Sequence, residues 1–192
     1  MRLPAALPLL IAALAAPGAA LAHTGVGAHG GPFVSGLLHP ILGPDHLLAM
    51  IAVGLLAGMT GGRALWGYPA SFVAAMILGG ALGYEGVALP IVEPAILASV
   101  VALGAAAAFA LRPPLALACA VIALFGIAHG YAHGLEGPAL GGLPYGAGFV
   151  LATTGLHLVG LAAGVLAGAR LPALARAMGG LTAAAGVFLA VA

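Results

Sequence analysis

The chain has 192 residues, a formal net charge of +1, 64% hydrophobic residues and only 5% charged residues. Its mean hydropathy of +1.23 excludes an ordinary soluble domain, in which about a quarter of the residues are charged, and indicates an integral membrane protein. The absence of lysine and of any basic run argues against nucleic-acid binding. The single cysteine excludes an internal disulfide and a zinc–thiolate site.

The first 22 residues have the features of a cleavable signal peptide. Arg2 supplies a positive start, an apolar stretch follows, and Ala20-Leu21-Ala22 forms a small-residue cleavage site. The alternative is an uncleaved anchor, since about 20 apolar residues can cross a bilayer. Cleavage would make His23 the first residue of the mature chain and the start of a periplasmic Gly/His-rich segment, residues 23–32, which also contains His29.

Residues 33–192 are expected to form one transmembrane permease domain of six helices. Gly, Pro and Arg positions delimit the spans, which cover about residues 33–59, 66–84, 88–111, 114–134, 144–168 and 172–192. The fold class is therefore all-α, and two halves of three spans each are compatible with a 3+3 inverted repeat. Glycines recur at four-residue spacing in several spans, which is typical of close helix packing in a bilayer.

Charged residues near the ends of the spans predict the orientation in the membrane. Arginines follow the first, third and fifth spans, at Arg63, Arg112, Arg170 and Arg176. Glutamates follow the second and fourth spans, at Glu85, Glu93 and Glu136. Because cytoplasmic loops collect Arg and Lys, we expect a multi-pass protein of the bacterial inner membrane with its mature N-terminus in the periplasm.

The first span contains an unusual group of polar and helix-breaking residues, His39-Pro40-Ile41-Leu42-Gly43-Pro44-Asp45-His46. Its prolines and glycine should interrupt the helix. Irregular backbone at membrane depth is tolerated only where it is buried in protein or lines a wet cavity. Since ionisable residues within a membrane commonly mark a functional site, the histidines and the aspartate are candidate metal ligands.

The fourth span contains a second group, His129-Gly130-Tyr131-Ala132-His133-Gly134-Leu135-Glu136. Spacings of four and seven place its two histidines and its glutamate on one helical face, which suits one metal ion. The candidate ligands of both groups are His39, Asp45, His46, His129 and His133. The alternative for this set is a merely structural polar cluster.

Four further residues form a second tier of metal-binding or pathway candidates, and each has a simpler alternative. Glu136 could be a solvated loop charge, His157 could be an interhelical hydrogen-bonding group, and His23 and His29 could belong to an exposed terminus. Thr153 and Thr154 are expected to bond back to their own helix. The orientation predicted above places the intramembrane candidates in the periplasmic half, where an importer would capture a cation.

The available ligands suggest the class of metal but not its identity. Imidazole and carboxylate without thiolate suit nickel, cobalt or zinc, although affinity order alone favours copper. No nucleotide-binding P-loop is present. A divalent cation that moves inward gains about 4.6 kcal/mol per 100 mV of membrane potential, so import needs no other energy source in principle, while proton coupling stays open.

The two groups resemble the motifs of the HupE/UreJ family of nickel and cobalt permeases. H-P-x-x-G-x-D-H corresponds to His39–His46, and H-G-x-A-H-G-x-E to His129–Glu136. The resemblance covers nearly the whole chain and implies secondary nickel uptake, sometimes cobalt uptake, for hydrogenase or urease assembly, with no organic cofactor. It marks the His and Asp of the first motif and the His pair of the second as important. Ala128 replaces an aromatic residue common in the family, which would alter the pocket shape.

Three other classes could use the same residues. A membrane metalloenzyme needs about three protein ligands and an open position, but no separate general base is evident. A metal-binding accessory or sensor protein would bind without transport, and a haem protein would need axial histidines. We favour a non-enzymatic transporter whose partners are the metal ion, the lipid bilayer and a downstream hydrogenase or urease maturation system; a homo-oligomer is compatible with this.

Overall fold

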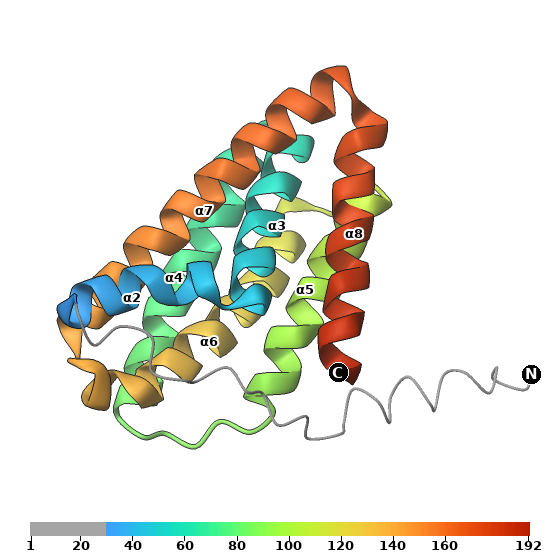
Figure 1. Ribbon diagram of the computed structural model, residues 1–192. Helices are drawn as coiled ribbons and strands as arrows, with labels where there is room; N and C mark the ends of the chain where they lie inside the picture. The colour runs from blue at the N-terminus through green and yellow to red at the C-terminus, as the bar shows by residue number, and fades with distance from the viewer. Residues whose placement is uncertain (1–29) are drawn as a thin grey trace, which may run out of the picture.

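The computed structural model describes residues 30–192, and these residues form helices and no strand (Figure 1). The helices are α2 (Gly31–Leu42), α3 (Pro44–Thr60), α4 (Ala64–Tyr84), α5 (Val92–Ala108), α6 (Leu115–Leu140), α7 (Leu143–Arg170) and α8 (Pro172–Val191). The predicted all-α class is confirmed for this part of the chain. The predicted signal peptide and the histidines at positions 23 and 29 lie outside the described residues.

A break at Gly43 divides the first predicted span into α2 and α3, which meet at an angle of 77°. Pro44 occupies the first position of α3, where its missing N–H is not needed. The residue before a proline is biased away from helical geometry, and Gly43 is extended, with φ −82° and ψ 111°. The predicted interruption is confirmed, and α2 lies across the bundle rather than along it (Figure 1).

Within residues 30–192, four helices are long and apolar enough to cross a membrane, namely α4, α6, α7 and α8. The bent pair of α2 and α3 makes a fifth crossing if it is counted as one span, and α5 is a shorter apolar helix of 17 residues. This pattern, by length and composition, is that of a multi-pass membrane protein. One predicted boundary is wrong: α6 continues to Leu140, so Glu136 lies within the helix and not in the turn after it.

The helices pack mainly as pairs, α3 with α7, α4 with α6 and α5 with α8. Glycines bring the paired backbones together. A Cβ atom at Gly54 of α3 would overlap the carbonyl of His157 in α7, and one at Gly79 of α4 would overlap the carbonyl of Ile127 in α6. The packing role predicted for the repeated glycines is therefore confirmed at these interfaces.

The two ends of the bundle differ in charge. The four acidic residues lie in one half, where α3 and α5 begin and α4 and α6 end: Asp45, Glu85, Glu93 and Glu136. Every arginine in the described part of the chain lies near the opposite ends of the helices: Arg63, Arg112, Arg170 and Arg176. Buried apolar side chains, including Val53, Leu55 and Ile122, separate the two ends. We refer below to the acidic end and the arginine end.

Candidate metal centre

A compact group of potential ligands joins α2 to α6. Its members are His39, His133 and Glu136, and one ligand atom from each lies within 4.8 Å of the others. The bend at Gly43 allows this contact because it turns α2 across the bundle. Ligand atoms bound to one metal at about 2 Å are about 3.3 Å apart in a tetrahedral site. Small side-chain rotations would therefore bring these three atoms into coordinating positions.

His46 of α3 extends the group. Its Nε2 atom lies 2.7 Å from Nε2 of His133, and both imidazoles are buried. The Nδ1 atom of His46 lies 2.8 Å from Oδ1 of Asp45, and the same oxygen accepts the backbone N–H of His46. An ionised carboxylate only accepts hydrogen bonds, so it fixes the proton on Nδ1 and leaves the Nε2 lone pair facing the cluster. Metal-binding histidines are commonly oriented by a carboxylate in this way.

Two aromatic side chains of α7 form a wall of this centre. Tyr145 places its hydroxyl 3.3 Å from Nδ1 of His133, and the ring centroid of Phe149 lies 4.0 Å from that of His133. Glu136 also approaches Nδ1 of His133, at 3.6 Å. The sequence interpretation missed both aromatic residues because an aromatic side chain in an apolar span does not by itself indicate a ligand.

His129 lies one helical turn from His133 but outside the compact group. It is fully buried, and its ring centroid is 4.7 Å from that of His46. Its Nε2 atom lies 3.0 Å from the hydroxyl oxygen of Ser99, which donates its own proton to the carbonyl of Ile96. His129 therefore donates from Nε2, and its Nδ1 lone pair has no hydrogen-bond partner among the described residues. Ser99 was not identified from the sequence.

His157 lies farther along α7, toward the arginine end. Its side chain is 1% exposed, and neither ring nitrogen has a hydrogen-bond partner among the described residues. The prediction that Thr154 bonds back to its own helix is confirmed, since its hydroxyl donates to the carbonyl of Val150. The same prediction for Thr153 is wrong: its hydroxyl lies 3.3 Å from the sulfur of Met50 and 3.7 Å from that of Met76.

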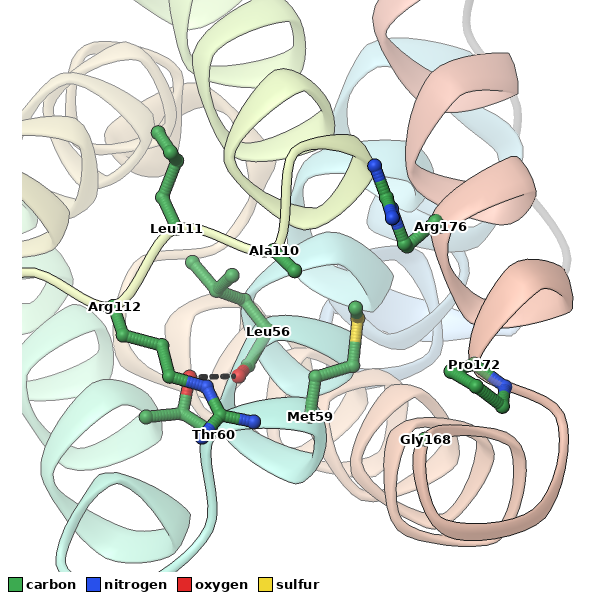
Figure 2. Close-up of a pocket in the computed structure, with 9 residues that line it drawn as sticks. All are labelled: Leu56, Met59, Thr60, Ala110, Leu111, Arg112, Gly168, Pro172 and Arg176. Carbon is green, nitrogen blue, oxygen red and sulfur yellow. Dashed lines mark hydrogen bonds between the residues drawn. The ribbon is translucent and has the colours of Figure 1, made fainter.

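A pocket at the arginine end differs in character from the histidine cluster (Figure 2). Its lining contains the guanidinium groups of Arg112 and Arg176 but no histidine or carboxylate. Thr60 donates a hydrogen bond to the carbonyl of Leu56 there (Figure 2), and Arg176 donates to the carbonyl of Ala108 near the end of α5. Because guanidinium groups repel cations, this pocket is a poor place to capture a metal ion.

Comparison with known proteins gives one family over almost the entire chain. The family described as HupE / UreJ protein matches residues 11–189. The chain is 43% identical over 183 residues to Protein HupE of Rhizobium leguminosarum bv. viciae, and the aligned region covers 94% of this chain and 95% of that protein. No solved structure matches the chain.

Proposed function

The chain belongs to the HupE/UreJ family, and we propose that it is a secondary transporter that imports a divalent transition metal, nickel or cobalt, from the periplasm to the cytoplasm. The observation that carries this proposal is the cluster of His39, His46, His133 and Glu136, which gathers three imidazoles and a carboxylate inside an apolar helical bundle. Ionisable side chains are costly at membrane depth. A cation that they bind during transport would explain why they are there.

The donor set favours a borderline transition metal over a hard cation. Imidazole nitrogen suits nickel, cobalt, copper and zinc, whereas calcium and magnesium prefer oxygen ligands throughout. Asp45 contributes through His46, whose Nε2 atom it directs toward the cluster. Because the imidazoles must be deprotonated to bind, this orientation also ensures that a lone pair is available. The family resemblance favours nickel or cobalt within this group of metals.

Our proposal includes a topology of six spans in which α2 and α3 together form the first and α5 forms the third. The mature N-terminus, after cleavage before His23, would be periplasmic, and His23 and His29 would gather metal for the entrance. A 3+3 inverted repeat would relate α3, α4 and α5 to α6, α7 and α8. The helix pairs support this relation, because it exchanges the α3–α7 pair with the α4–α6 pair and keeps α5 with α8.

The proposed role is to supply metal ions and not to catalyse a reaction. The imported metal would reach a hydrogenase or urease maturation system in the cytoplasm. Nickel accumulation in cells that lack their own nickel importers tests this role. Cells that express the chain should accumulate nickel, and His46→Ala/His133→Ala should abolish accumulation at matched membrane abundance. A Thr154→Val variant serves as the control, because Thr154 is exposed and bonds only within its own helix. Near-normal uptake by the double variant would contradict the proposal.

A further inference from the structure

His157 is the most isolated buried polar side chain in the described part of the chain. Its imidazole is 1% exposed, and both of its nitrogens are without hydrogen-bond partners. A buried polar group that makes no hydrogen bond lowers stability, so such a group in a folded protein calls for an explanation. A ligand that occupies the site for part of the time would supply one.

Two methionine sulfur atoms, which could also bind a metal ion, lie beside the preceding turn of α7. Thr153 precedes His157 by one turn of α7, and the sulfur atoms of Met50 and Met76 lie 3.3 and 3.7 Å from its hydroxyl oxygen. Helical side chains lean toward the helix N-terminus, so the imidazole of His157 leans toward this turn. Both methionines are buried, with exposures of 0% and 2%.

His129 connects this region to the cluster of His39, His46, His133 and Glu136, which we call the outer cluster. Its Nδ1 lone pair has no partner among the described residues, and its ring centroid lies 4.7 Å from that of His46. The ring centroid of Phe72 lies 5.4 Å from that of His129 and 5.2 Å from that of His157. The two histidines that have unpartnered nitrogens therefore contact the same aromatic ring.

We propose that His157, the Nδ1 atom of His129 and the thioethers of Met50 and Met76 form a second metal-binding site, which receives the ion from the outer cluster. This inference rests on the proposed function and deepens it. Imidazole and thioether donors select borderline and soft metals and reject magnesium, calcium and manganese. The acidic residues of the chain all lie in the outer half, so this inner site has no carboxylate of its own.

The outer cluster contains a carboxylate and the proposed second site does not. This difference in charge would make the second site a place that the metal ion occupies briefly during transport. An ion must bind well enough to enter a pathway and weakly enough to leave it. Carboxylates at the outer cluster attract a dication strongly, whereas neutral imidazole and thioether donors hold it less tightly. The inner site would therefore accept an ion drawn inward by the membrane potential and release it toward the arginine end.

The test combines uptake with spectroscopy on the full-length protein. We expect His157→Leu and Met50→Leu/Met76→Leu to lower the maximal rate of nickel uptake by roughly tenfold or more, while the half-saturating nickel concentration changes little because the outer cluster is intact. Met178→Leu is the matched control, since Met178 lies at the arginine end beside Arg170 and belongs to neither site. X-ray absorption of the nickel-loaded protein should show sulfur ligands that Met50→Leu/Met76→Leu removes.

Two controls separate this inference from the proposed function and from a folding defect. The purified wild-type protein should bind two nickel ions and His157→Leu one, whether or not the wild type transports nickel in the assay. Burying a leucine side chain in apolar surroundings costs less free energy than burying an imidazole that makes no hydrogen bonds. His157→Leu should therefore match or exceed the thermal stability of the wild type. Unchanged nickel stoichiometry in a folded His157→Leu protein, or nickel without sulfur ligands in the wild type, would overturn the second site.

Discussion

Asp45 and His46 work as one unit in the histidine cluster. The carboxylate accepts hydrogen bonds from both the ring and the backbone nitrogen of its neighbour, so it fixes the ring orientation as well as the tautomer. The Nε2 atom that remains faces His133 at 2.7 Å. At this scale the essential feature is a single lone pair that is held in position, as the proposed metal site requires.

Replacing Asp45 with asparagine tests this arrangement. An asparagine would keep the size of the side chain but could donate to Nδ1 as well as accept, so His46 would no longer be held in one tautomer. We expect Asp45→Asn to reduce nickel affinity or uptake by about 10- to 100-fold, measured as the nickel concentration that gives half-maximal uptake. Glu85→Gln, at an exposed acidic residue outside the cluster, should leave uptake close to that of the wild type; an equal loss in both variants would point to a general charge effect.

The residues that could be predicted from the sequence are those with a strong chemical identity. Histidine and aspartate are conspicuous in an apolar span, and the structure places His39, His46 and His133 together. Tyr145 and Ser99 could not be predicted, because their roles depend on which helix packs against which histidine. Their positions follow from tertiary packing, which the spacing of residues along one helix does not contain.

At the scale of elements, the break between α2 and α3 positions the site. A straight helix would carry His39 and His46 along one face, whereas the 77° bend turns α2 toward α6 and brings His39 to His133. Pro44 and Gly43 allowed the break to be predicted. The direction in which α2 turns could not be predicted, because it depends on contacts of α2 with α7.

Glycine contacts should control whether the paired helices assemble. Gly79 of α4 faces the carbonyl of Ile127 in α6 so closely that an added Cβ atom would overlap it. Gly79→Ala should therefore force the two backbones apart and destabilise the fold by about 1–3 kcal/mol, seen as a lower thermal midpoint in detergent. Gly155→Ala adds the same methyl group where no atom lies within 4 Å. A similar midpoint for both variants would contradict the packing role of Gly79.

At the scale of the whole molecule, charge is segregated along the bundle. The acidic half holds the histidine cluster, and the arginine end holds a pocket lined by Arg112 and Arg176. The positive-inside rule predicts that the arginine end is cytoplasmic. The histidine cluster would then face the periplasm, as the proposed uptake requires.

Labelling of single cysteines tests this orientation directly. Cys119 is the only cysteine in the sequence, so Cys119→Ser provides a cysteine-free background. New cysteines beside Arg63, Arg112 and Arg176 should be protected from a membrane-impermeant thiol reagent in intact cells, whereas those beside Glu93 and Gly141 should react. Labelling beside Arg112 from outside would refute the six-span topology, because it would place the end of α5 in the periplasm.

Metal accumulation by the purified chain in liposomes tests the central claim most directly. An inside-negative potential of 100 mV favours a dication inside by about 4.6 kcal/mol, equivalent to a concentration ratio on the order of a thousandfold. We predict that liposomes containing only this protein accumulate radioactive nickel to a level that rises with the imposed potential, and that liposomes containing His46→Ala/His133→Ala do not. Wild-type liposomes that bind nickel yet accumulate no more than the double variant would contradict transport and indicate a metal-binding accessory protein.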